Sequence, residues 1–218
     1  MSVPAQRPVP VFPLPDVVLF PHVRLPLHVF ELRYRRLVRD ALAGEREIAI
    51  ATLRPGWEQD YQGSPAFHEL ACLGRFEQVR WLPDDCYDIV LMGLRRVRLG
   101  AVHHEFPYRS CACEPCPEQP HEDGDPLAEM ERHALLAEMR RLLPLGGEAW
   151  RTSPGTADDA SLEVIVNTMA HALRVDVAAR LDLLGLDSVL DRAQRLHEHL
   201  RRIRGSPPRE GGAAAERN

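Results

Sequence analysis

Three cysteines and several histidines gather near the middle of the chain, and they are the residues best suited to hold a metal ion. The cluster consists of Cys111, Cys113 and Cys116 with His103, His104 and His121. Thiolate and imidazole groups suit tetrahedral zinc. However, a second closely spaced ligand pair is missing, and Cys111 and Cys113 alternate with small residues as in a strand. We therefore expect buried thiols here and no metal site.

Other side chains that could do chemistry are poorly placed for it. His197 and His199 point about 200° apart on a helix, so they do not form a zinc motif, and we expect them on a solvated helix surface. Cys72 and Cys86 could act as nucleophiles with a distant histidine. They are predicted to lie in a strand and a turn, where no helix N-terminus would activate them. We expect no catalytic residue and no cofactor.

The basic residues narrow the choice of function further. All 27 are arginines, because the sequence contains no lysine. This absence excludes a phosphate-binding loop that ends in Gly-Lys, Schiff-base chemistry and a Ser–Lys dyad. The net charge of −5 does not favour binding to a nucleic-acid backbone. Two arginine clusters, Arg33–Arg39 and Arg95–Arg98, are therefore expected to pair with acidic side chains.

Aromatic side chains in a polar loop are the candidates for binding. Trp57, Tyr61 and Phe67 lie within residues 54–68, between two expected strands. Large rigid side chains on a loop often mark a contact surface. The alternative is that they fold back over the strands beneath them. We take these three residues as candidates for the rim of a peptide-binding groove.

The elements that must position these residues are mostly strands up to residue 114. We expect strands at 9–14, 24–30, 47–53, 70–82, 87–99 and 106–114, with one helix from residue 31 that ends at Gly44. Pro10 and Pro13 predict that the first strand is an edge strand or is bulged. Ile89, Leu91, Val97 and Leu99 are expected on one face of the fifth strand, where Gly93 indicates a bulge or a close backbone approach.

Helical periodicity replaces the strand pattern after a proline-rich linker at 115–125. Helices are expected from residue 126 onward. The first should bury an apolar stripe formed by Leu127, Met130, Ala134, Leu135, Met139 and Leu142. The expected organisation is a flexible N-terminus at 1–8, a β-domain at 9–114, the linker, a helical bundle at 126–204 and a disordered tail at 205–218. This is an α+β arrangement. No segment has the length of a membrane span or the pattern of a signal peptide, so a cytoplasmic protein is expected.

Two blocks of the β-rich half resemble a known family. The segments PLPDVVLFP at 13–21 and LPLHVFELRY at 25–34, followed by Leu73-Gly74 and by YDIVLMGLRRV at 87–97, are similar to the N-terminal substrate-binding domain of Lon proteases. The resemblance covers about residues 9–204. It implies a PUA-like, partly closed β-domain followed by a C-terminal α-helical bundle. It also implies that Glu31 and Arg33 form a structural pair between helix and strand.

The resemblance also has implications for function. The chain lacks the lysines and the length that the ATPase and protease modules of Lon require. The resemblance therefore implies a stand-alone, non-catalytic module that recognises unfolded or exposed polypeptide. Its partners would be such segments and a protease or chaperone, with no membrane. One alternative is an RNA-binding PUA-like module, which requires both arginine clusters on one face. Another is a small-ligand sensor with an aromatic pocket.

Overall fold

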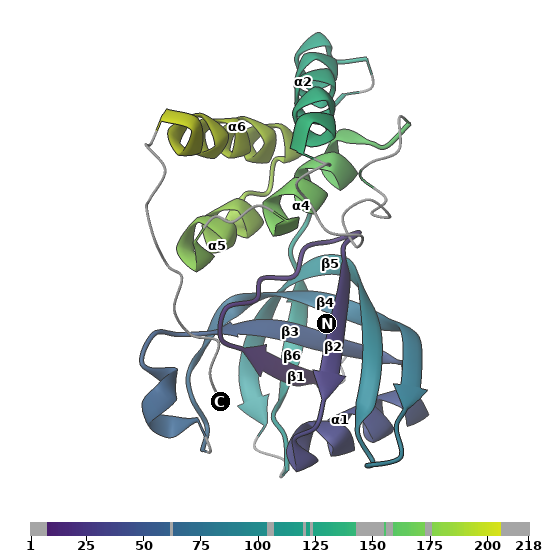
Figure 1. The fold of residues 1–218 in the computed structure, drawn as a ribbon. Helices are drawn as coiled ribbons and strands as arrows, with labels where there is room; N and C mark the ends of the chain where they lie inside the picture. The colour runs from purple at the N-terminus through teal and green to yellow at the C-terminus, as the bar shows by residue number, and fades with distance from the viewer. Residues whose placement is uncertain are drawn as a thin grey trace, which may run out of the picture.

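Six strands form a barrel in the first half of the chain (Figure 1). The computed structural model describes residues 8–61, 63–103, 107–119, 121–122, 124–142, 155, 159–172 and 176–205. The strands are β1 (Val9–Leu14), β2 (Arg24–Val29), β3 (Glu47–Leu53), β4 (Phe67–Trp81), β5 (Tyr87–His103) and β6 (Ser110–Pro115). Their order is β2-β5-β4-β3-β1-β6, and β6 also pairs with β5. Five strands thus close into a ring, while β2 remains an edge strand beside β5.

Strand β1 lies inside the sheet, so the prediction of an edge strand was wrong. It runs parallel to β3 and antiparallel to β6. Each proline nevertheless lies where β1 has only one neighbour. Pro10 pairs with Ser110 of β6, and Pro13 pairs with Ala51 of β3. A proline lacks the amide donor for a second ladder, so these two positions tolerate it.

A register shift divides β5 between two apolar clusters. Leu73 of β4 pairs with Arg95, whereas the next residue, Gly74, pairs with Gly93, so β5 has one extra residue at this point. A shift of one residue reverses the face to which every following side chain points. Ile89 and Leu91 therefore pack in the larger cluster, while Val97 and Leu99 pack in a smaller one. The expectation that all four share a face was wrong.

The predicted close approach at Gly93 is confirmed. A Cβ atom at this position would lie 2.0 Å from the carbonyl oxygen of Phe20. The Gly93 amide donates to the Val23 carbonyl at 2.9 Å, and its carbonyl accepts from the His22 amide at 2.8 Å. The segment between β1 and β2 is thus held against β5. As a result, Val18, Leu19 and Phe20 are buried although they belong to no strand.

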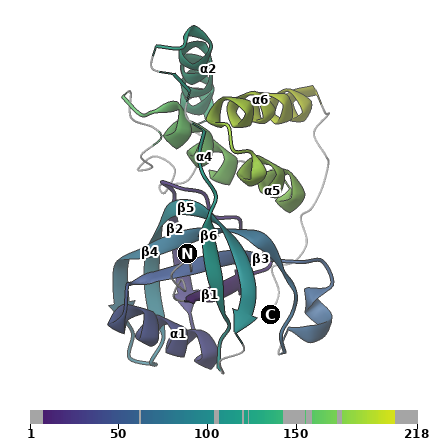
Figure 2. The same ribbon diagram turned by 180° about the vertical axis from the view of Figure 1, so that it is seen from behind.

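Helix α1 (Leu32–Ala43) covers the end of the barrel away from the other helices (Figures 1 and 2). It buries Tyr34, Leu37, Val38 and Ala41, and the Tyr34 ring stacks on Phe12 at 4.3 Å between centroids. The predicted end of the helix at Gly44 is confirmed. Gly44 has a φ of −110°, however, and it is Arg46 that adopts a left-handed φ of 62°.

Four described helices form the second half. They are α2 (Pro126–Leu142), α4 (Leu162–Ala172), α5 (Val177–Gly185) and α6 (Val189–Gly205), and they lie over one end of the barrel (Figure 1). Helix α2 buries Ala128, Leu135, Leu136 and Met139. Leu127, Met130 and Ala134 of the expected stripe are exposed instead. The larger apolar cluster joins the two halves, since it contains side chains from the barrel, α1 and all four of these helices.

Two expectations about the ends of the chain fall largely outside the described residues. These are the flexible N-terminus, described only at Pro8, and the disordered tail, described only at Gly205. Within the part of the chain that the structure describes, no helix is long and apolar enough to cross a membrane.

Candidate functional site

The aromatic loop is fixed to α1 through Tyr61. The loop contains the short 3₁₀ helix η1 (Trp57–Asp60), which follows Gly56 in a left-handed conformation. The Tyr61 hydroxyl donates to Glu31 Oε1 at 2.5 Å, and Arg33 Nη2 donates to the Tyr61 carbonyl at 3.0 Å. The hydrogen bond to Glu31 raises the pKa of Tyr61. Tyr61 therefore anchors the loop, and the predicted pair of Glu31 and Arg33 is confirmed at 3.0 Å.

Trp57 and Phe67 lie in different surroundings. Trp57 packs edge-on against Tyr61, with 5.4 Å between ring centroids, and is partly buried. Phe67 begins β4, packs against the smaller apolar cluster and has the Arg109 guanidinium 4.5 Å from its ring centroid. Successive strand residues point to opposite faces, so it is the next residue, His68, that lies on the same cleft as Trp57. The structure does not bring the three predicted residues together in one surface.

The cleft beside Trp57 is the site that this geometry favours. It has a volume of about 510 Å³ and lies between the barrel and α5. The barrel side is lined by Pro15, Asp16, Leu53, Pro55, Trp57, Glu58 and His68. Helix α5 contributes Val177, Ala178 and Leu181. Val177 and Leu181 are four residues apart, so they lie on the same face of α5 and form one wall of the cleft.

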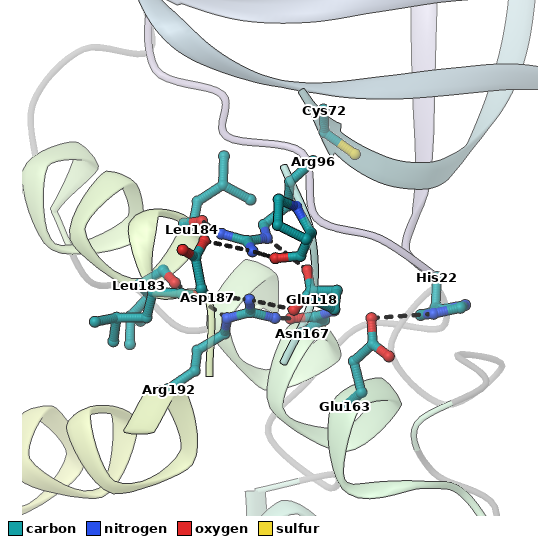
Figure 3. Close-up of polar contacts among 12 residues, drawn as sticks. His22, Cys72, Arg96, Glu118, Glu163, Asn167, Leu183, Leu184, Asp187 and Arg192 are labelled. Carbon is teal, nitrogen blue, oxygen red and sulfur yellow. Dashed lines mark hydrogen bonds and ion pairs between the residues drawn. The ribbon is translucent and has the colours of Figure 1, made fainter. Parts of the chain in front are cut away.

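Helix α5 is held in position by two buried arginines at its C-terminus (Figure 3). Arg96 Nη1 donates to the Leu184 carbonyl at 3.0 Å, and Arg192 Nε donates to the Leu183 carbonyl at 3.1 Å. The last carbonyls of a helix have no partner within the helix and favour positive charge nearby. Arg96 comes from β5 and Arg192 from α6, so these contacts join α5 to both neighbours.

Glu118 of the linker joins the two arginines to each other. Its Oε1 accepts from Arg96 Nε at 2.5 Å, and its Oε2 accepts from Arg192 Nη2 at 2.8 Å (Figure 3). Asp187 accepts from Arg96 at 2.9 Å, and the Asn167 side-chain carbonyl accepts from Arg192 at 2.9 Å. Burial lowers the pKa of Arg192, which Glu118 partly opposes. The cleft wall formed by α5 thus depends on a charge network in the core.

The other end of α5 is tied to the loop that follows β1. Asp176 caps the helix by accepting from the Ala179 amide at 2.7 Å. Arg180 Nη2 donates to the main-chain carbonyl of Asp16 at 2.8 Å. Both ends of the helix are therefore attached to neighbouring parts of the protein. The cleft is a fixed feature of the fold.

The comparisons with known proteins fit this architecture. The family model for the ATP-dependent protease La (LON) substrate-binding domain matches residues 8–202. The chain belongs to this family. A Lon protease 2 from Herpetosiphon aurantiacus is 27% identical over 192 residues, covering 86% of the chain and 23% of that protein. A Lon protease from Brucella melitensis biotype 1 is 23% identical over 188 residues, covering 85% of the chain and 22% of that protein.

Solved Lon-type domains have the same fold. A Lon N-terminal domain protein from Xanthomonas campestris matches with a TM-score of 0.64 and 23% identity, covering 88% of this chain and 98% of that one. The N-terminal domain of Lon protease from the Mycobacterium avium complex matches with a TM-score of 0.66 and 20% identity, covering 88% and 97%. The expected architecture, a partly closed β-domain followed by helices, is confirmed. The chain spans less than a quarter of the curated Lon proteases named above.

The first arginine cluster of this Lon-type domain makes ion pairs, as expected, whereas in the second only Arg96 does so within the described residues. On α1, Arg33 pairs with Glu31, Arg36 with Asp40, and both Arg35 and Arg39 with Asp85. Asp85 lies in the β4–β5 turn, before β5 begins, whereas Arg96 is buried farther along β5 under α5. The two clusters lie at different ends of the barrel. The RNA-binding alternative required them on a single face.

The cysteines are free thiols packed in the Lon-type barrel. Cys111 is buried in the smaller apolar cluster, and Cys113 packs against it. Burial raises the pKa of both thiols, to about 11 for Cys113, and also raises that of Cys72. Within the described residues, no three His, Cys, Asp or Glu side chains are grouped to hold a metal, while His104 lies outside these residues. The expected absence of a metal site stays a prediction.

The histidines of α6 differ from the expectation. His197 is only 19% exposed, and its Nδ1 lies 2.5 Å from Glu131 Oε2 on α2. His199 is also partly buried. The prediction of a solvated helix surface was wrong for His197, because the helix-helix contact between α6 and α2 covers it. The sequence carries no local signal for this pairing, since 66 residues separate the two partners.

Proposed function

We propose that the cleft between η1 and α5 binds exposed segments of unfolded polypeptide. The observation that carries this proposal is the position of Trp57 on a cleft whose other wall is α5, with Val177 and Leu181. Large aromatic side chains in apolar clefts commonly supply most of the binding energy at an interface. The family's description as a substrate-binding domain supports the same function.

The lining of the cleft favours polypeptide over a small ligand. Seven of the ten lining residues are apolar, and only Asp16, Glu58 and His68 carry polar side chains. A specific small-molecule site usually has several polar groups that converge to fix the ligand's orientation. A polypeptide needs fewer polar groups in its binding site, because its successive side chains can pack on a mostly apolar surface. The cleft therefore suits recognition of apolar segments without a defined sequence.

We further propose that the domain is non-catalytic and hands its polypeptide to a protease or chaperone partner. The absence of lysine removes a Ser–Lys dyad. A cysteine nucleophile needs a lowered pKa, whereas burial raises the pKa of Cys72, Cys111 and Cys113. Trp57 is retained as a binding residue, while Tyr61 and Phe67 support the loop and the barrel. The cytoplasm, where thiols remain reduced, is the proposed location.

Trp57→Ala provides the test. We expect it to weaken binding of a labelled, permanently unfolded polypeptide by about tenfold or more, because a cleft side chain of this kind acts as a hot spot. The measurement is fluorescence anisotropy with reduced, carboxymethylated protein as the probe. Unfolding in urea should show that the variant keeps its stability, since the Trp57 side chain is only partly buried.

Trp81→Ala is the matched control. Trp81 is 66% exposed and ends β4, whereas His68 of the cleft lies at the start of that strand. We expect this variant to bind like the unchanged protein. Equal losses in both variants, or no binding of unfolded polypeptide at all, would contradict the proposal. Binding of RNA that weakens steeply with salt would support the alternative instead.

A further inference from the structure

Two carboxylates line the cleft beside its apolar surface. Asp16 follows β1 and Glu58 lies in η1, and both are exposed. Neither carboxylate forms an ion pair or hydrogen bond within the described part of the chain. Some carboxylates elsewhere on the barrel are paired, such as Glu77 with Arg24 and Glu47 with Arg75. The two cleft carboxylates remain accessible to a ligand.

Of the cations near the cleft, Arg180 interacts with the charge of Asp16: burial lowers the pKa of Arg180, and this charge opposes the lowering. Arg180 donates to the main-chain carbonyl of Asp16, and Arg54 donates through Nε to the Phe67 carbonyl at 3.1 Å. No arginine is among the lining residues. Burial and the nearby Arg54 lower the pKa of His68, so its ring is neutral at pH 7. The cleft thus combines an apolar surface with two carboxylates, of which Asp16 is partly balanced by Arg180 and Glu58 is not paired within the described residues.

We infer that the cleft selects polypeptide segments in which an apolar side chain is flanked by arginine or lysine. The apolar side chain would pack between Trp57 and α5, and the cationic group would reach Asp16 or Glu58. The aliphatic stem of arginine or lysine can lie along apolar surface while its charge stays in water. Acidic flanks would be repelled, which adds selectivity against them. This inference rests on the proposed function, because it names the substrate class of the same cleft.

The test uses three labelled peptides that share a Leu-Phe-Leu core and differ only in their flanks, which are arginine, glutamine or glutamate. We expect the arginine peptide to bind about fivefold more tightly than the glutamine peptide at low salt, and the glutamate peptide to bind more weakly still. The difference should shrink as salt rises from about 50 mM to about 500 mM, because exposed charges are screened. Fluorescence anisotropy gives the three affinities.

Variants that remove the carboxylate charges test whether the preference for the arginine peptide arises in the cleft. In the double variant Asp16→Asn, Glu58→Gln, the arginine and glutamine peptides should bind with equal affinity. Glu45→Gln with Glu114→Gln removes the same charge from exposed positions away from the cleft, and it should leave the preference intact. Equal binding of all peptides to the unchanged protein would overturn this inference alone. Failure of every peptide and of unfolded protein to bind would overturn the proposed function.

Discussion

Glu118 bridges two guanidinium groups that are buried in the core. Arg96 and Arg192 have fully buried side chains, and each donates a hydrogen bond to a different oxygen of the Glu118 carboxylate. Removing one partner from a buried ion pair leaves a charge without compensation, which costs far more than the loss of an exposed pair. Glu118 therefore contributes to the position of α5, and with it to one wall of the cleft.

Glu118→Gln should therefore destabilise the protein by about 3 kcal/mol, because the amide keeps the shape but loses the charge. Urea unfolding measured by far-UV circular dichroism gives the free energy of unfolding. Glu45→Gln, at an exposed position, should change it by less than about 0.5 kcal/mol. A Glu118→Gln variant as stable as the Glu45→Gln control would show that the network contributes little.

Gly93 is required by a close backbone contact. Alanine at this position would place Cβ 2.0 Å from the Phe20 carbonyl oxygen, so the β1–β2 segment or β5 would have to move. We expect Gly93→Ala to cost about 3 kcal/mol of stability. Gly100→Ala in the same strand meets its nearest atom at 3.5 Å and should cost less than about 0.5 kcal/mol. Similar melting temperatures for the two variants would contradict this account.

Single residues differed in how well the sequence predicted them. Gly93 was recognisable because a glycine within an apolar strand usually marks a bulge or a close backbone approach. Trp57 was chosen because a large aromatic residue in a polar loop is unusual, and its role in binding stays a prediction. The buried role of Arg96 was not recognisable, since Arg95 and Arg98 in the same run are exposed. Which of these arginines is buried depends on the register shift in β5 and on contacts with Glu118 and α5, which are distant in the sequence.

At the level of elements, the segment between β1 and β2 is joined to α4 by an ion pair. His22 Nε2 lies 3.3 Å from Glu163 Oε1 (Figure 3). The hydrogen bond to Glu163 raises the pKa of His22, and the same bond lowers the pKa of Glu163. Folding thus favours the protonated histidine and the ionised carboxylate. This pair is a further attachment between the barrel and the helices.

The pH dependence of the pair has a defined sign. The contribution of His22 is complete below its unfolded pKa of 6.5 and is lost as the pH rises through its raised folded value. The contribution of Glu163 is complete above 4.5 and is lost as the pH falls through its lowered folded value. We expect a coupling energy of about 0.5 kcal/mol at about pH 6 that approaches zero above about pH 8.

A double-mutant cycle of His22→Gln and Glu163→Gln, measured by urea unfolding at both pH values, isolates this coupling. Burial lowers the pKa of His171, which changes stability with pH in the opposite direction. His171 is present in all four proteins of the cycle, so its effect cancels. A coupling energy that stays constant or grows with pH would contradict the assignment.

Helices and strands were predicted correctly where the local sequence pattern was sufficient. The face that an element buries was missed where contacts with neighbouring elements determine it. The strands β1 to β5 and the helices were recognisable from periodicity. The buried face of α2 was predicted only in part. Leu135 and Met139 are buried as expected, whereas Leu127 is apolar but exposed, because the packing against α4 and α6 selects between these positions. The faces of β5 were reversed by one extra residue opposite Gly74. The contribution of α5 to the cleft depends on contacts with β5 and α6 that lie far away in the chain.

On the scale of the whole molecule, barrel and helices share one apolar cluster. Phe12 and Leu37 of the first half belong to the same cluster as Leu135, Ile165 and Leu196 of the second. A shared core of this kind makes the two halves unfold together. The linker, at 115–125, therefore connects two parts of a single cooperative unit in spite of its composition.

Cooperative unfolding can be measured with separate probes for each half. Ellipticity at 222 nm reports chiefly the helices. Trp57 and Trp81 report the barrel once the third tryptophan, which lies outside the described residues, is replaced in a Trp150→Phe background. We expect the two probes to give the same urea midpoint. Two separate midpoints would show that the halves are independent domains.

The closure of the ring by β1 and β6 has a consequence for how the chain is made. Val9 pairs with Cys111, about a hundred residues later. During synthesis the N-terminal strand leaves the ribosome first, yet one of its two neighbours is translated only after β5 is complete. Contacts between such distant positions slow folding, since a large loop must close before they form. Until then, the Val18–Phe20 segment and the unpaired side of β1 are exposed to aggregation. A domain proposed to bind unfolded chains thus passes through such a state itself.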